Sequence, residues 1–240
     1  MAKDLKKNSV VPGAEDVSTN DMSFSFIKLI QKSSTVKGTK PGDIVDSASG
    51  KKLGETVNVI PIKKFIDWIK FNDDFQVEDR SQDGITWKNS GDKLDEEEKW
   101  KNKRINFFVL LEDQEPDTLP YCLSFGKTSY KAGQKMQKIS DQHIVLDKQP
   151  IFSQMFAVSS HEEPFGKYKS FVFDVELVGD IEDQAFLKSA MQLRESMQKK
   201  IQQNPERLLE APQEQEEAAP PAKKAAAVPD KKGLKVKRAY

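Results

Sequence analysis

Apolar and polar residues alternate with a period of two in several runs between Ser23 and Gly179, a pattern typical of β-strands. Turn signals separate these runs, notably Pro41-Gly42 and SASGKKLGE at 47–55. Pro61 interrupts the longest run and predicts an edge position or a bend there. The predicted strands are SFSFIKLI (23–30), DIVD (43–46), TVNVIPIKKFIDWIKF (56–71), RINFFVLLE (104–112), LPYCLSF (119–125), IFSQMFAVSS (151–160) and KYKSFVFDVELVG (167–179).

The spacing of apolar residues changes to three or four after this region, which predicts an amphipathic helix over 181–204 that ends at Asn204-Pro205. A shorter helix is predicted over 129–139. The apolar stripe of the long helix consists of Ile181, Ala185, Phe186, Ala190, Leu193, Met197 and Ile201. Short strands followed by one helix predict a mainly β fold, a small barrel or sandwich with a helical appendage. An oligonucleotide-binding barrel fits this pattern.

The pattern also divides the chain into parts. Residues 1–21 show no period and predict a flexible N-terminal arm. Residues 22–180 form the β-rich domain, which carries a charged, turn-rich insertion near 72–103 that we expect to be partly ordered. Residues 205–240 are rich in Pro, Ala and charge, so we expect a disordered tail with a basic end.

Composition narrows the possible functions. The chain has 38 basic and 38 acidic residues, so an electrostatic site requires local segregation of charge. The single cysteine, Cys122, lies in an apolar run and is expected to be a small buried side chain in a reducing compartment. No apolar run has the length of a signal peptide or of a membrane span. We therefore expect a cytosolic protein, in the host cytoplasm if a phage encodes it, that does not bind membranes.

The stretch LSFGKTSYKAG at 123–133 contains Gly-Lys-Thr-Ser, the end of a phosphate-binding loop. That loop requires a glycine five positions before the Gly-Lys pair, so that the backbone can curl around the phosphates. The chain has Tyr121 at that position, and its side chain obstructs the curl. The stretch therefore predicts a strand, a glycine turn and a basic segment rather than an ATPase.

Other catalytic patterns are weak. The two histidines, His143 and His161, do not have metal-ligand spacing with each other or with the cysteine. The residues of SSHEEP (159–164) are neighbours in one loop, whereas triads assemble from separate elements. The acidic run Asp95–Glu98 is typical of a solvated face. We therefore predict that the protein is not an enzyme and has no metal site or cofactor.

Basic residues interleaved with aromatic ones give a stronger signal. Cationic groups follow the phosphates of single-stranded nucleic acid, while aromatic faces stack on its bases. The same pattern also arises from core aromatics beside solvated lysines, and this alternative stays open. Trp68 and Tyr130 are the members that we expect to be exposed. The candidate DNA-binding residues are Lys40, Lys51, Lys52, Lys63, Lys64, Trp68, Lys70, Lys127, Tyr130, Lys131, Lys135 and Lys169.

The ordered set IKLIQKSS, KGTKPGDIVDSASGKKLG, VNVIPI, LSFGKTSYKAGQKM and PIFSQMFAVSS resembles a group of tailed-phage single-stranded DNA-binding proteins, over roughly 26–179. The resemblance implies an oligonucleotide-binding-type barrel that coats single-stranded DNA during phage replication or recombination, without catalysis. It implies phage replication proteins as further partners, and self-association is a further expectation. Many proteins of that type end in an acidic tail, whereas this chain ends in KKGLKVKRAY, which puts acidic-tail recruitment in doubt.

An alternative is a structural or interaction protein that binds a protein partner through the 181–201 stripe and the basic tail. This alternative requires the stripe to be exposed. The competing expectation is that the stripe packs on the β-rich domain, which is the usual fate of an amphipathic helix.

Overall fold

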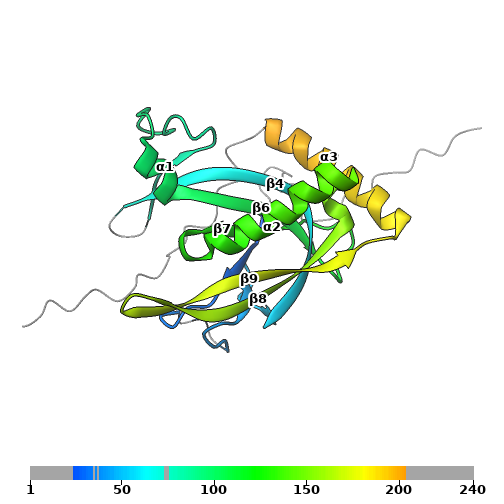
Figure 1. The fold of residues 1–240 in the computed structure, drawn as a ribbon, viewed down its shortest axis with the longest axis horizontal. Helices are drawn as coiled ribbons and strands as arrows, with labels where there is room; N and C mark the ends of the chain where they lie inside the picture. Colours follow the sequence, from blue (N-terminus) through cyan, green and yellow to red (C-terminus); the bar gives the residue numbers. More distant parts are fainter. Residues whose placement is uncertain (1–23, 35, 37, 73–75, 204–240) are drawn as a thin grey trace, which may run out of the picture.

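The computed structural model describes residues 24–34, 36, 38–72 and 76–203 (Figure 1). The predicted N-terminal arm and C-terminal tail lie outside these residues. The described strands form one sheet in the order β3-β2-β1-β7-β6-β4-β8-β9, and β5 pairs with β4 off this path. The strands are β1 Phe26–Leu29, β2 Ile44–Asp46, β3 Lys52–Gly54, β4 Thr56–Phe71, β5 Val77–Ser81, β6 Lys103–Leu111, β7 Tyr121–Gly126, β8 Gln154–Phe165 and β9 Tyr168–Asp180.

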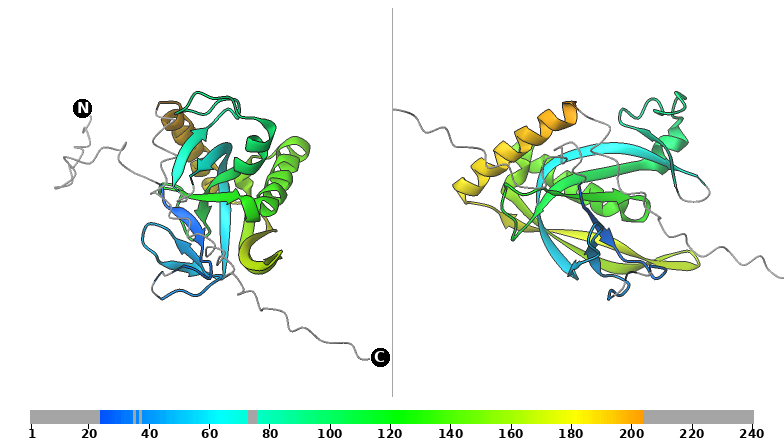
Figure 2. Two further views of the ribbon diagram at one scale, coloured as in Figure 1. Left: turned by 90° about the vertical axis from the view of Figure 1, so that its left-hand side faces the viewer. Right: turned by 180° about the vertical axis from the view of Figure 1, so that it is seen from behind.

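Helices cover the sheet from two sides. The helices are α1 Glu96–Asn102, α2 Tyr130–Gln142 and α3 Gln184–Gln203, with short helical turns η1 Lys127–Ser129, η2 His143–Asp147 and η3 Ile151–Ser153. Helix α2 packs on β6, β7 and β9, and α3 packs on β4 and η3. Seen from the side, α2 and the β2–β3 hairpin lie on opposite sides of the molecule (Figure 2). The fold is therefore mainly β with a C-terminal helix, as the sequence predicts.

Strand β4 organises the sheet. Thr56–Val59 pair with β8, residues 59–68 pair with β6, and Trp68–Phe71 pair with β5. The register with β6 shifts between Pro61 and Lys63, which is a bulge at the position where the proline predicts a bend. Strands β8 and β5 thus pair with the same edge of β4, and β6 pairs with the other edge. The sheet curls around a core in which Phe107, Phe125 and Phe156 are fully buried.

Strand pairing does not close this curled sheet into a barrel, because β3 and β9 stand at opposite ends of the pairing order. The Gln31 side chain bridges the two arms instead. Its Nε2 donates to the Phe171 carbonyl at 2.9 Å, and its Oε1 accepts from Phe171 N at 3.0 Å. Ser160 Oγ adds a bond to the Gly42 carbonyl. The expected barrel is therefore an open sheet with a seam made by side chains.

The charged segment 72–103 contains more regular structure than its composition suggests. Its described residues form β5, a bridge between Thr86 and Lys93, and α1. The Asp79 carboxylate accepts from the backbone N–H groups of Asn89 and Ser90, which fixes the turn. The Trp87 side chain is buried. This segment extends from the end of β4 beside the rest of the sheet (Figure 1).

The apolar stripe of α3 packs on the sheet. Ala190 and Met197 are buried, and Phe186 and Leu193 contact the core. The helix starts at Gln184 rather than Ile181 because the Asp183 side chain accepts from the first N–H groups of the helix. The stripe from Phe186 to Met197 is thus engaged within the chain, contrary to what the protein-partner alternative requires, and the Ile201 side chain lies outside the described part of the structure.

Candidate nucleic-acid interface

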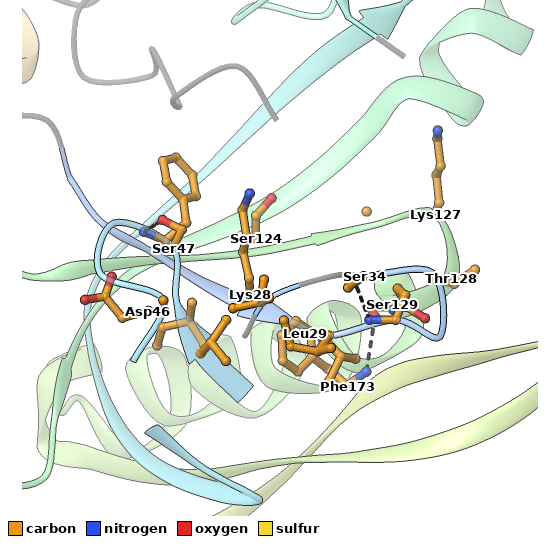
Figure 3. Close-up of a pocket in the computed structure, with 18 of the residues that line it drawn as sticks. Lys28, Leu29, Ser34, Asp46, Ser47, Ser124, Lys127, Thr128, Ser129 and Phe173 are labelled. Carbon is orange, nitrogen blue, oxygen red and sulfur yellow. Dashed lines mark hydrogen bonds between the residues drawn. The ribbon is translucent and has the colours of Figure 1, made fainter. Parts of the chain in front are cut away.

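A cleft arises where two strands diverge. Strand β1 pairs in parallel with β7 only through Phe26 and Ile27. Beyond these residues the strands separate, and the cleft, about 390 Å³ in volume, lies between β1 and the segment 124–129 (Figure 3). The Gly-Lys-Thr-Ser stretch that resembles part of a phosphate loop therefore forms one wall of a cleft.

Basic side chains from separate elements line this cleft. Lys28 comes from β1, Arg104 from β6, and Lys127 from the turn after β7. Lys28 and Lys127 extend in the same direction on either side of the cleft (Figure 3). Asp46 is the acidic residue of the lining. Burial works to raise the pKa of Asp46, but hydrogen bonds from Ser25, Ser49 and the backbone outweigh it and lower the pKa, which keeps this carboxylate charged.

The Phe71 ring contacts two of these cations. The Arg104 guanidinium lies 5.0 Å from the centre of the Phe71 ring, and the Lys127 ammonium lies 5.1 Å from it. Each contact is a cation–π interaction, which stabilises a charge at the ring face. Two like charges beside one ring repel each other, and an anion between them relieves that repulsion. The arrangement is therefore suited to binding an anionic group.

The backbone of the turn adds to the positive character of the cleft. Lys127 has φ 41°, in the left-handed region that residues with a Cβ rarely adopt. Helix α2 follows directly, and no side chain caps its N-terminus, because Ser129 Oγ accepts from Phe173 N instead. The N-terminus of a helix carries a partial positive charge. That charge adds to the charges of Lys127 and Arg104.

A second, smaller depression continues from the cleft along the sheet. The two share Phe26, Arg104 and Ser124 in their linings. Cross-strand pairing explains the continuity, since Arg104 lies opposite Gly126 and Asp67 lies opposite Arg104. We call the cleft and the depression together the basic groove. The depression is lined by Phe26, Phe65, Asp67, Ile69, Phe71, Val77, Arg80, Arg104, Asn106, Cys122 and Ser124.

Of the twelve residues predicted from the sequence, Lys127 lines this groove and the other eleven do not. Lys63 packs near Arg194 of α3, where burial and that charge lower its pKa. Lys51 is exposed on the β2–β3 turn. Seven other lysines pair with carboxylates at distances from 2.6 to 3.7 Å, namely Lys40 with Glu55, Lys52 with Asp43, Lys64 with Asp141, Lys70 with Glu78, Lys131 with Glu163, Lys135 with Asp174 and Lys169 with Glu162.

Trp68 and Tyr130, expected to be exposed, are half-buried. Trp68 Nε1 donates to the Lys99 carbonyl, and its ring packs against Gly84. Tyr130 makes an edge contact with Trp100, with ring centroids 5.9 Å apart. Both rings therefore help to hold the α1 segment, and their role in DNA binding stays a prediction.

The structure also joins a serine, a histidine and an aspartate. His143 lies 2.8 Å from Ser153 Oγ and 3.0 Å from the Asp147 carboxylate. Ser153 Oγ, however, donates to the Pro150 carbonyl, and both Ser153 and His143 are buried. The contacts therefore fix η2 against η3, and they leave the hydroxyl poorly placed to act as a nucleophile. Cys122 is buried in the core, as expected.

The described ranges contain neither a cluster of metal ligands nor a helix that could span a membrane. No group of three or more His, Cys, Asp or Glu side chains in these ranges is arranged to hold a metal ion. None of the helices in the same part of the chain is long and apolar enough to cross a membrane.

Sequence reasoning missed Lys28, Arg80 and Arg104, although each is visible in the strand pattern. Arg104 lies on the same face of β6 as Asn106, and Lys28 lies on the same face of β1 as Phe26. Arg104 and Lys28 therefore lie on the face of the sheet that α2 does not cover. The missing information was which strands pair, because β1, β6 and β7 are distant in sequence.

Comparison with known proteins gives a match to a protein family. A family model described as Pam3 phage gp34-like protein matches residues 1–203. No curated protein and no solved structure matches the chain.

Proposed function

The chain belongs to the Pam3 phage gp34-like family, and on that premise we propose that it binds single-stranded DNA in the basic groove during phage DNA replication or recombination. We propose a binding protein that tolerates many sequences, rather than an enzyme. Phage replication proteins and a second copy of the chain are further expected partners.

The convergence of four cations on one groove supports this proposal most strongly. Lys28, Arg80, Arg104 and Lys127 come from four different elements of a chain whose net charge is zero. Such local segregation is the usual electrostatic signature of a nucleic-acid site. Aromatic side chains, which bases of a single strand stack on, line the same groove, namely Phe26, Phe65 and Phe71.

The groove suggests how a strand binds. The cations on the two walls of the cleft contact successive phosphates, as Lys28 and Lys127 extend in the same direction (Figure 3). Phe26 is half-buried and lines both parts of the groove, so its exposed face is placed to stack on a base. Stacking of this kind contributes about 1–3 kcal/mol per base. A cleft of about 390 Å³ accepts a nucleotide but not a duplex.

Fluorescence anisotropy with labelled single-stranded and double-stranded DNA of equal length tests the proposal. We expect tighter binding to the single strand and an affinity that falls as salt rises, because phosphate contacts release counterions. Arg104→Gln and Lys127→Gln are each expected to weaken binding about five- to tenfold and to reduce the salt dependence.

Lys131→Gln and Lys135→Gln are the matched controls. Both remove a lysine charge from α2, and both lysines lie in ion pairs outside the groove. We expect these variants to bind like the wild type. Equal affinity for duplex, or an equal loss in the controls, would show that the groove is not a single-strand site.

A further inference from the structure

The floor of the basic groove carries a buried polar pair that simple phosphate binding does not need. Asp67 on β4 is 4% exposed and Asn106 on β6 is 3% exposed. Asn106 Nδ2 donates to Asp67 Oδ1 at 2.7 Å. Both side chains line the depression between Phe26 and Phe65. A carboxylate under a groove for an anionic strand opposes binding unless it contacts something other than phosphate.

This pair is costly for the fold. Burial raises the pKa of Asp67, although the Asn106 hydrogen bond and the charges of Arg104 and Arg80 partly oppose the rise. A buried ionisable group is rarely the most stable choice, and apolar residues of similar volume often stabilise a protein more. A perturbed carboxylate in a cleft is therefore a candidate for function.

The Asp67 and Asn106 side chains have oxygen atoms that can accept further hydrogen bonds. Among the described residues, Asn106 Nδ2 and the Asp67 backbone N–H donate to the Asp67 carboxylate, whose two oxygens can accept further bonds. Asn106 makes its bond through Nδ2, which leaves its Oδ1 as an acceptor. Both side chains line the depression, so these oxygens lie next to a group that enters it. A carboxylate oxygen and an amide oxygen only accept hydrogen bonds. The floor thus presents two acceptors to whatever lies above it.

The size of the depression limits what enters it. Its volume is about 20 Å³, which is room for one water-sized group rather than for an aromatic ring. An amino group on the edge of a base has that size, while the ring above it rests near Phe26. Cytosine presents such a donor, N4–H₂, at the position where thymine and uracil present the O4 acceptor.

We propose that Asp67 and Asn106 read the exocyclic amino group of one base in the bound strand, so that the groove favours cytosine over uracil or thymine at that position. This inference rests on the proposed function. An oxygen at the same position faces two acceptors, so the wrong base loses a hydrogen bond and meets repulsion. The preference is modest beside the sequence-independent phosphate contacts.

Binding of dC20 and dU20 tests the inference, because these oligonucleotides differ only in the donor and acceptor groups of the base edge. We expect the wild type to bind dC20 about fivefold more tightly at pH 7.5. Asp67→Asn keeps the shape of the side chain but adds a donor that faces the amino group. The ratio of the two affinities is expected to fall to about one in this variant.

Glu112→Gln is the matched control. The Glu112 carboxylate also accepts from an asparagine, Asn58 Nδ2 at 2.8 Å, but it is exposed and lies outside the groove. This variant is expected to keep the wild-type ratio. The use of a ratio separates base reading from a general change in affinity, and thermal unfolding verifies that each variant is folded.

The outcomes distinguish the two proposals. Equal affinity of the wild type for dC20 and dU20 overturns base reading and leaves single-strand binding standing, and this comparison depends on no variant. A preference that persists in folded Asp67→Asn also overturns the assignment to this pair. If the wild type binds neither oligonucleotide, the proposed function itself fails.

Discussion

At the scale of single residues, two lysines occupy the left-handed backbone region, Lys127 at φ 41° and Lys148 at φ 58°. This conformation costs a residue with a Cβ about 1–2 kcal/mol relative to glycine. Lys148 ends η2, where a left-handed residue is a common way to close a helix. Lys127 instead begins a turn on the wall of the cleft, where strain is often tolerated for function.

Lys127→Gly is therefore expected to separate stability from binding. Glycine relieves the backbone strain, which offsets the lost contact with Phe71 and the greater entropy of the unfolded chain. We expect the free energy of unfolding to change by less than about 1 kcal/mol. The affinity for single-stranded DNA should fall about five- to tenfold, as measured by anisotropy beside chemical denaturation.

Lys148→Gly makes the same substitution in the same backbone region, but outside the groove. It should leave the affinity unchanged and stabilise the protein slightly. Loss of binding in both variants would mean that the effect comes from general changes in charge or folding, not from the position of Lys127.

The residue scale also shows where sequence reasoning stops. The sequence indicated Lys127, because a lysine after a strand and a glycine stands out without any knowledge of its neighbours. Arg104 was not singled out, since a charged residue at the start of an apolar strand is ordinary. Its value comes from Phe71, which is distant in sequence and lies beside it only after β4 and β6 pair.

At the scale of elements, the close approach of α2 to β7 depends on one glycine. A Cβ on Gly133 would lie 2.5 Å from Phe125 Cβ, which is closer than two carbons can pack. Phe125 is fully buried and contacts Phe107 and Phe173. This packing holds the N-terminal turn of α2 at the cleft.

Gly133→Ala is expected to destabilise the protein by up to about 2 kcal/mol. Alanine favours the helix by about 1 kcal/mol, but overpacking of a tight core costs about 1–3 kcal/mol, because α2 must move away from the sheet. Thermal unfolding measures the difference. Gln134→Ala, at the next and exposed position of α2, should change stability little. A more stable Gly133→Ala variant would contradict the packing of α2 on Phe125.

The long strands and helices were predictable because each shows its own period. The predicted run 56–71 coincides with β4, and its proline marks the bulge. The charged segment near 72–103 was harder, because its order depends on carboxylates such as Asp79 that accept backbone hydrogen bonds. From composition alone, such residues are expected to be charged groups in contact with solvent, and their backbone hydrogen bonds cannot be predicted.

At the scale of the whole molecule, the strand order could not be predicted from local patterns. A barrel and an open sheet use the same alternating strands, and they differ only in whether the end strands pair. Here a side chain from the segment after β1 connects the two arms of the sheet. The seam holds the β8–β9 hairpin near the segment that lines the cleft.

The seam predicts a local effect of Gln31→Leu. Leucine removes the bonds to Phe171 N, to the Phe171 carbonyl and to Ser170 Oγ. Loss of such bonds at a partly buried site costs about 1–3 kcal/mol, so the Phe171 amide should exchange with solvent about ten- to a hundredfold faster. Amides at the centre of β6, such as Phe107, should change less, because the seam opens without unfolding the sheet. Gln137→Leu, which removes a bond within α2, is the control. Equal acceleration at Phe171 and Phe107 would show that Gln31 stabilises the whole fold, and no acceleration would show that the seam does not hold the arms together.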